Sequence, residues 1–551
     1  MSLNSEKKFS IVFLSFFSLI FILILVKVGI IIFTHNNGAK QYNNPQVADT
    51  VIRGSILDRN NNYLAVEIPA YDLVFFKNYI PSLEYAASLV SPYTGLSKDE
   101  LLQKCEKANN YVMVKRNVSL GAVTDLNEEI KVNKLQKGIV LEKRQGRTYP
   151  STFHASQIIG FTNTENKGLE GIEYKYDDIL TPYPEVNTST TYGANIALTL
   201  DLDIQYLMDV QVQNIIKDED PDCVMALVMD AKTGDILAST SAPWYDLNNY
   251  STSTEGERFN RVSGYSYEPG SVFKVFSLAS CIENGIDTET PFICDGSETF
   301  TVDGQSFTIN CHEKHGEVTG KEMISKSCNG AIAYWVLQLD KQVFYDFLSS
   351  LGFGQVVNSG MNGNIKGTLK EVDTWSNRSQ ATISFGQEVA VSALQIVQAA
   401  SAIANDGVMV KPEILKGIYT HDGKLVYAPE RETKEVMSKE TAQKLREYMV
   451  EATKAGTAVL ANVPGVEICS KTGTSQIINP ETNSYDDGYT LASTLTIVPA
   501  KEPKYIIYFA VVHPKVNVWG ANIASPAIGA IINGLIGQGK IESEIQKSIS
   551  L

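Results

Sequence analysis

The longest run of hydrophobic residues lies near the start of the chain. Residues 9–33 are apolar except for three serines, one glycine and Lys27, and Lys7 and Lys8 precede the run. Such a run is long enough to cross a bilayer and too long for the core of an ordinary signal peptide. Because basic residues favour the cytoplasmic side, the pattern predicts an uncleaved anchor, with residues 1–8 in the cytoplasm and the rest of the chain outside. A cleaved signal peptide is the alternative.

The next part of the chain is expected to form a domain of its own. It follows a polar linker at residues 34–49 and covers residues 50–210, where glycines and charged residues are embedded in apolar context. Within it, residues 53–60 predict a short strand and a tight turn held by Arg–Asp pairing. The mixed pattern at residues 97–133 predicts a helical insertion.

The pattern changes again near residue 200, where alternation gives way to a helical period that runs to about Lys217. Residues 224–238 then predict a hairpin, and residues 494–512 predict two further strands before an apolar helix at 524–536. Strands at both ends with helices between them predict an α/β domain over residues 211–551, with a mostly antiparallel sheet closed by both ends of the domain.

Composition limits the function classes. Hydrophobic residues make up 44% of the 551, which is ample for buried cores in a chain long enough for about two to four domains. The formal net charge of −15 argues against a nucleic-acid surface, which would need a basic stripe. Seven cysteines are few and odd in number for a chain outside the cytoplasm, so they do not form a disulfide scaffold.

The chemistry is expected around Ser271 and Lys274. Pro269 and Gly270 suit a turn into a helix, so Ser271 should lie in its first turn with Lys274 on the same face. A serine hydroxyl needs a base, and a lysine amine can serve only when burial or a cationic neighbour disfavours its charge. Alone, however, Ser-x-x-Lys is more often a solvated helix face than a catalytic pair.

Two downstream motifs change that interpretation. Ser327-Cys328-Asn329 and then Lys471-Thr472-Gly473-Thr474 follow in the order of the Ser-x-x-Lys, Ser-x-Asn and Lys-Thr-Gly set of penicillin-interacting serine enzymes. Residues 466–478 predict a strand for the third motif, and such a strand can lend backbone N–H groups to an oxyanion and to an extended peptide. Lys232-Thr233-Gly234 is a decoy in a predicted hairpin turn. Cys328 is expected to fill buried space and not to act as a second nucleophile.

A pair of cysteines flanks a predicted hairpin. Cys294 and Cys311 lie on either side of an alternating pattern centred on Asp303-Gly304. A two-residue turn there makes the two cysteines diagonal and not directly opposed, too far apart for a disulfide without a bulge or bend at Gly296. A disulfide and two buried free thiols are both open.

No metal or cofactor is expected. His312 and His315 follow the hairpin, but the sequence shows no third ligand at a recognisable spacing.

Together these features resemble a class B penicillin-binding protein, a monofunctional peptidoglycan D,D-transpeptidase. The resemblance covers nearly the whole chain: the anchor, residues 53–60 and 168–173 of the N-terminal pedestal, and all three active-site motifs. It implies a penicillin-binding/β-lactamase-like serine transpeptidase domain after a mainly-β pedestal. Residues 267–271 and the cysteine hairpin look closest to the septal and sporulation branch. Ser475, where many relatives have alanine, is a departure.

The resemblance also implies a role for each motif residue. Ser271 would be the nucleophile, Lys274 the general base and Ser327 a proton donor to the leaving group. The other implied roles are a hydrogen bond from Asn329 to the donor peptide and to Lys274, positive potential from Lys471, carboxylate binding by Thr472, Gly473 and Thr474, and a backbone oxyanion hole from Ser271 and Thr474.

The implied ligands are peptidoglycan stem peptides and β-lactams, and the implied partners are a membrane glycan polymerase and division proteins. The alternatives are a D,D-carboxypeptidase or class D-like β-lactamase, an elongation-specific transpeptidase, and a non-catalytic β-lactam-binding scaffold. The size of the region before residue 211 argues against the hydrolases, and the intact motif residues argue against the scaffold.

Overall fold

The computed structural model describes residues 26–27, 50–118, 120–186, 188–479, 482 and 484–543. The predicted anchor at residues 9–33 lies outside this part of the chain, apart from Val26 and Lys27. The chain divides into two compact units, Met1–Val51 with Tyr183–Thr191, and Ile52–Pro182 with Tyr192–Leu551. The helices and strands that the structure describes from residue 50 onward belong to the second unit, except strands β1 and β6, whose residues fall mainly in the first.

The N-terminal part is built on the long strand β3 (Tyr63–Phe76), which pairs with β4 (Tyr111–Val118) and β5 (Ile139–Thr148). Helices α2, α3 and α4 bury apolar residues against this sheet, so the region around residues 97–133 is helical, as predicted, but also contributes strand β4. The other elements are β1 (Thr50–Ile52), β2 (Ile56–Leu57), η1 (Lys77–Tyr79), α2 (Leu83–Thr94), α3 (Lys98–Lys107), α4 (Leu120–Val132), α5 (Ser156–Ile159), α6 (Gly171–Lys175), α7 (Asp177–Leu180), β6 (Thr190–Tyr192) and β7 (Asn195–Leu198).

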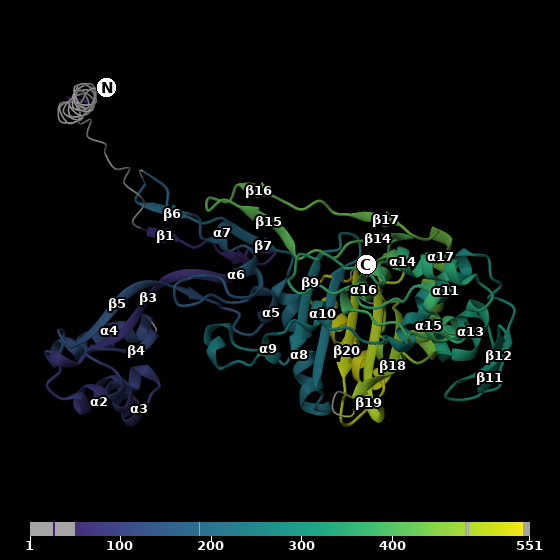
Figure 1. The fold of residues 1–551 in the computed structure, drawn as a ribbon, viewed down its shortest axis with the longest axis horizontal. Helices are drawn as coiled ribbons and strands as arrows, with labels where there is room; N and C mark the ends of the chain where they lie inside the picture. The colour runs from purple at the N-terminus through teal and green to yellow at the C-terminus, as the bar shows by residue number, and fades with distance from the viewer. Residues whose placement is uncertain are drawn as a thin grey trace, which may run out of the picture. The chain divides into compact units, whose positions relative to one another are not determined.

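A hairpin from much later in the chain completes this sheet. The strand order is β16-β15-β7-β2-β3-β4, with β5 also on β3. Strand β15 (Leu415–Tyr419) pairs with β7 and with β16 (Leu425–Tyr427), although both β15 and β16 belong to the sequence range predicted for the second domain. Figure 1 shows them as green strands beside the blue β7.

Arg53 forms a buried charge network instead of the local pairing predicted for residues 53–60. Its guanidinium contacts Glu173 at 2.7 Å and Asp177 at 2.6 Å, and Arg147 contacts the other Glu173 oxygen at 2.6 Å. Asp58 accepts the backbone N–H groups of the turn that follows. The predicted turn is therefore confirmed, but the arginine partners come from a segment about 120 residues later because a buried guanidinium needs buried carboxylates.

A five-stranded antiparallel sheet, in the order β18-β19-β20-β8-β9, forms the centre of the C-terminal part. Strands β8 (Cys223–Asp230) and β9 (Ile236–Ala242) come from its start and β18 (Cys469–Asn479), β19 (Ser484–Val498) and β20 (Tyr505–Val512) from its end, as the sequence predicts. Helices α8 (Leu202–Glu219) and α18 (Gly520–Gly537) bury one face, and the other face packs on helices that include α16 (Ala393–Ala404) and α17 (Lys439–Ala455) (Figure 1).

The helical region between these strands carries the first two motifs. Its elements are η2 (Leu247–Thr252), α9 (Glu255–Arg258), α10 (Arg261–Gly264), η3 (Gly270–Phe273), α11 (Lys274–Glu283), β10 (Phe292–Cys294), β11 (Ser297–Val302), β12 (Gln305–Asn310), β13 (Gly316–Val318), α12 (Gly320–Lys326), α13 (Asn329–Val336), α14 (Lys341–Ser350), η4 (Val372–Thr374), α15 (Ser379–Ser384), β14 (Val408–Val410), β17 (Thr433–Glu435) and η5 (Val459–Ala461). The predicted Asp303-Gly304 turn is confirmed, because β11 and β12 pair from Val302↔Gln305 out to Ser297↔Asn310.

Helix α18 is long and apolar enough to cross a membrane by length and composition. It packs, however, against β19 and β20 in the core, and 56% of its apolar window is buried. Its burial explains its hydrophobicity, as expected for the core helix of a globular domain.

Candidate active site

The turn that carries Ser271 is pressed against the strand that carries the third motif. Ser271 lies in the 3₁₀ turn η3, and α11 begins at Lys274, so the predicted helix start is correct but tighter than an α-helical turn. Gly270 has φ of 56°, and a Cβ there would lie 2.9 Å from the Thr474 carbonyl oxygen. A Cβ on Gly473 would lie 2.6 Å from the Ser493 Oγ on β19 and 2.9 Å from Val272 in the nucleophile turn. Both glycines are therefore needed for this close approach.

Lys274 is buried and aimed at the second motif. Its Nζ donates hydrogen bonds to the Ser327 carbonyl at 2.5 Å and to the Ser327 hydroxyl at 3.1 Å. Within the described residues it makes no hydrogen bond to the Ser271 hydroxyl. Burial lowers the pKa of the Lys274 ammonium to about 8, because a charged group loses hydration in the protein interior. A neutral amine is thus accessible near physiological pH.

Lys471 contacts the same hydroxyl. From β18 its Nζ donates to the Ser327 Oγ at 3.0 Å and to the Thr472 carbonyl at 2.8 Å, and the side chain is fully buried. Burial and then the positive charge of Lys274 hold the pKa of Lys471 well below its usual value. The Ser327 hydroxyl therefore contacts both lysines, and each proton on one lysine disfavours a proton on the other.

Local backbone geometry puts Ser327 in this position. It ends α12 in the left-handed region, with φ of 59°, and the next residue caps α13. Non-glycine residues rarely adopt this conformation, and such strain is concentrated at functional sites. This turn between α12 and α13 directs the Ser327 side chain toward Lys274 and Lys471.

The remaining motif residues have partners within the fold. The Asn329 amide donates to the Asn310 carbonyl at the end of β12, at 2.9 Å, and the hydrogen bonds of the Lys274 Nζ go to Ser327 instead of Asn329. The Thr472 hydroxyl donates to the Thr457 hydroxyl at 2.8 Å, while the half-buried Thr474 hydroxyl accepts a weak bond from the Gly520 N–H at 3.4 Å. The predicted roles of these residues toward substrate remain predictions.

One supporting residue is visible only in the structure. The Ser475 hydroxyl donates to the Glu268 carbonyl at 2.7 Å, which ties the strand of the third motif to the chain two residues before the nucleophile turn. The sequence marked Ser475 only as a departure from alanine in relatives. In the sequence, the signal for this contact is a hydrogen-bonding side chain directly after the Lys-Thr-Gly-Thr motif. That signal does not identify Glu268 as the partner.

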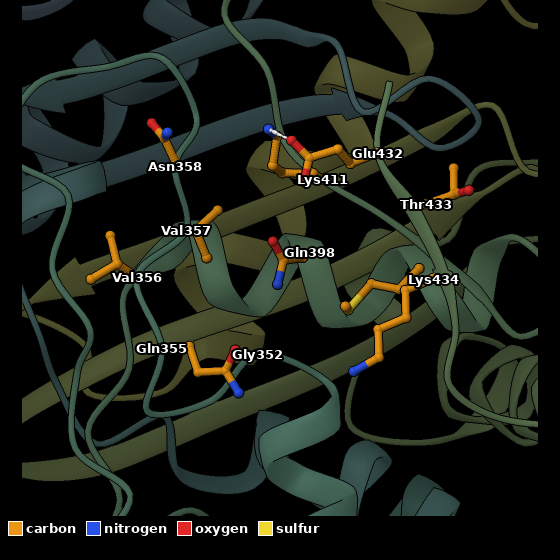
Figure 2. A pocket seen from close by; sticks show the side chains of 11 residues that line it. Gly352, Gln355, Val356, Val357, Asn358, Gln398, Lys411, Glu432, Thr433 and Lys434 are labelled. Atoms are coloured by element: carbon orange, nitrogen blue, oxygen red, sulfur yellow. Dashed lines mark hydrogen bonds and ion pairs between the residues drawn. The ribbon is translucent and has the colours of Figure 1, made fainter. Parts of the chain in front are cut away.

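The structure also contains a cavity away from the three motifs. A cavity of about 520 Å³ opens between the segment at residues 352–358, α16 and strands β14 and β17, and Lys411 and Glu432 pair at its edge (Figure 2). Its lining includes no residue of the three motifs. We therefore locate the chemistry by the motif residues and not by this cavity.

Comparison with known proteins agrees with the motif order. Residues 224–533 match the penicillin binding protein transpeptidase domain, and residues 48–195 match the penicillin-binding protein dimerisation domain. Stage V sporulation protein D of Bacillus subtilis (strain 168) is 27% identical over 511 residues, which cover 87% of this chain and 77% of that protein. Peptidoglycan D,D-transpeptidase FtsI of Escherichia coli (strain K12) is 26% identical over 523 residues, covering 89% and 84%.

A solved structure is similar in fold and sequence over nearly the same length. Penicillin binding protein 3 from Mycobacterium tuberculosis, complexed with aztreonam, has a TM-score of 0.72 and 26% sequence identity, covering 90% of this chain and 98% of that one. The catalytic family alone matches more than half of the chain. The chain therefore belongs to the penicillin-binding protein transpeptidase family, and it is a class B penicillin-binding protein.

Proposed function

We propose that this protein cross-links peptidoglycan as a serine D,D-transpeptidase, with Ser271 as the acylated residue. The observation that carries the proposal is the meeting of all three motifs at one oxygen: the Ser327 hydroxyl accepts hydrogen bonds from Lys274 and Lys471, while the Ser271 turn packs on the strand of Lys471. Three segments more than fifty residues apart in the sequence thus form one acid–base system beside a serine.

Acylation follows from this arrangement. The Ser271 oxygen attacks the carbonyl carbon of the penultimate D-Ala, and its proton moves to the neutral Lys274 amine. The developing oxyanion is held by the backbone N–H groups of Ser271 and Thr474, where one such donor is worth about 3–4 kcal/mol. The bond to the terminal D-Ala nitrogen then breaks, and that nitrogen takes a proton through the Ser327 hydroxyl.

Transfer completes the reaction. An amine from a neighbouring stem peptide attacks the acyl-enzyme carbonyl, loses its proton to the same acid–base system and releases Ser271. Lys471 supplies positive potential for the terminal carboxylate of the donor peptide, with hydroxyls from Thr472 and Thr474 beside the backbone of Gly473. A β-lactam would acylate Ser271 by the same first step.

The test separates cross-linking from hydrolysis. The full chain in detergent is incubated with a stem pentapeptide, with and without an acceptor amine, and the products are identified by mass spectrometry. We expect D-Ala release and an amide-linked dimer that requires the acceptor, and neither product from Ser271→Ala. Release of D-Ala without a dimer would support a carboxypeptidase, and labelling of Ser271→Ala by penicillin would refute the assigned nucleophile.

The domain plan and location belong to the same proposal: a cytoplasmic tail (1–8), an anchor (9–33), a linker (34–49), a pedestal (50–210) and an extracytoplasmic transpeptidase domain (211–551). The similarity to Stage V sporulation protein D and FtsI supports a role in septal wall synthesis. Protease added to spheroplasts should digest the chain beyond residue 34, and protection of that part would reverse the topology.

Partners follow from the same location. A membrane glycan polymerase supplies the strands to be cross-linked, and we propose that it binds the anchor and pedestal together with division proteins. Exchange of residues 9–33 for an unrelated anchor should weaken recovery of the polymerase with the chain. Unchanged recovery and localisation would remove the anchor from that contact.

A further inference from the structure

Three cysteines and one histidine meet beside the second motif. Cys294 ends β10, Cys311 directly follows β12, His315 directly precedes β13, and Cys328 lies between Ser327 and α13. Their sulfur and imidazole nitrogen atoms all lie within 4.8 Å of one another. Cys294 and Cys328 are buried, and the other two side chains are half-buried. The cluster is therefore shielded but open on one side.

Three of the six separations within the cluster are close to the edges of a metal-centred tetrahedron. The Sγ atoms of Cys294 and Cys311 are 3.7 Å apart, as are those of Cys311 and Cys328, and Cys294 Sγ lies 3.4 Å from His315 Nδ1. Zinc binds thiolate sulfur at about 2.3 Å and imidazole nitrogen at about 2.0–2.1 Å, which gives tetrahedral edges of roughly 3.8 Å between sulfurs and roughly 3.6 Å from sulfur to nitrogen.

A disulfide would explain the positions of fewer of these four side chains than a bound metal ion does. All three cysteines are free, and a disulfide between Cys294 and Cys311 would have to bring their sulfurs to about 2.05 Å. It would also leave the third thiol and the imidazole directed at the same point without a function. Ordinary buried thiols pack as small apolar groups, which does not explain a converging histidine.

The surrounding groups favour thiolates. The Gly330 N–H donates to Cys311 Sγ and the Ala331 N–H donates to Cys328 Sγ, both at 3.4 Å. These donors form the first turn of α13, whose N-terminus favours negative charge. The Lys326 ammonium donates to the His315 carbonyl at 3.1 Å and so fixes the loop from the other side. Such outer contacts orient ligands in metal sites.

We propose that Cys294, Cys311, His315 and Cys328 bind one zinc ion. Three thiolates and one neutral imidazole complete a four-coordinate site with no position for water, which is typical of structural zinc. Binding releases three protons from the thiols. The site ties the β11–β12 hairpin to Cys328, and so holds Ser327 and Asn329 in place; this last role rests on the proposed function.

The proposal corrects the expectation of no metal. The ligands are separated by 16, 3 and 12 residues, which is not the paired spacing of common zinc motifs. The sequence predicts that Cys294 and Cys311 flank a hairpin and that Cys328, within the second motif, fills buried space. Only the fold shows that α13 begins at the open end of that hairpin.

Metal content is the direct test. The full chain is purified in detergent with a thiol reductant and without chelator, and zinc per chain is measured by inductively coupled plasma mass spectrometry. We expect one zinc in the native chain and its loss in Cys311→Ser and His315→Gln. His312→Gln is the matched control, because His312 is an exposed histidine of the same loop outside the cluster. Ser271→Ala should keep its zinc, which separates this proposal from the proposed function.

Two further measurements keep the proposal testable if a variant does not fold. Cobalt added to the metal-stripped native chain should give thiolate-to-cobalt charge transfer and the intense d–d bands of tetrahedral coordination. Chelation should slow penicillin acylation, and zinc should restore it. A reduced native chain that neither retains nor takes up zinc overturns the proposal. So do unchanged zinc in the ligand variants and a metal-free Cys294–Cys311 disulfide in non-reducing peptide maps.

Discussion

Acylation of Ser271 should depend on pH through the protonation of Lys274. The base must be neutral to accept the serine proton, and burial lowers the pKa of its ammonium to about 8. The neutral fraction is then about 1 in 100 at pH 6, 1 in 11 at pH 7 and 1 in 2 at pH 8, since each pH unit changes the ratio tenfold. The acylation rate should therefore rise about 50-fold from pH 6 to pH 8, and less than twofold above that.

The assay is the second-order rate constant for labelling of the full chain by a fluorescent penicillin, from pH 6 to pH 9, with far-ultraviolet circular dichroism to show a constant fold. Lys274→Arg keeps the charge but cannot become neutral, so its labelling should be slower by about 10²–10⁴-fold and should not respond to pH in this way. A native rate that is flat over this range, or that still rises tenfold per unit above pH 8.5, would refute the assignment of Lys274 as base with a pKa lowered by burial.

Three substitutions test the supporting structure. Gly473→Ala crowds both Ser493 on the next strand and Val272 in the nucleophile turn, so overpacking should cost about 1–3 kcal/mol and slow penicillin acylation at least tenfold; normal acylation would contradict the close approach. Glu173→Gln removes the carboxylate that Arg53 and Arg147 share and leaves Arg53 with Asp177, so it should cost about 3–5 kcal/mol, seen as a lower unfolding midpoint; an unchanged midpoint would contradict a buried network. Ser475→Ala removes one hydrogen bond worth about 1 kcal/mol, so the midpoint should fall by a few degrees while acylation stays within about fivefold; a complete loss of acylation would give Ser475 a larger role.

The sequence predicted most of the fold because local patterns determine it. The hairpin at Asp303-Gly304 has a turn dipeptide with alternating flanks, and the inner strands β8 and β20 of the catalytic sheet have nearly continuous apolar patterns, so their form follows from nearby residues. The three catalytic motifs were also predicted as one site. Their order identified the family pattern, and the fold brings Lys274, Ser327 and Lys471 together.

Contacts between distant segments could not be predicted in this way. The partners of Arg53 were sought in its own turn, but burial of the guanidinium required Glu173 from another part of the chain. The cysteine–histidine cluster combines a strand end, a loop and a helix start, and no spacing rule joins them. The direction of the Asn329 side chain likewise depends on where β12 ends, which local sequence does not specify.

The pairing of β15 with β7 has a consequence for biosynthesis. Leu415 lies opposite Leu198, and the roughly 200 residues between them take roughly 10–40 s to synthesise at about 5–20 residues per second. During that interval the β7 edge of the N-terminal sheet has open backbone hydrogen-bonding groups, which can pair with another chain. Chaperone binding to the nascent protein should therefore be strongest in this window, and a ribosome pause before residue 427 should increase misassembly.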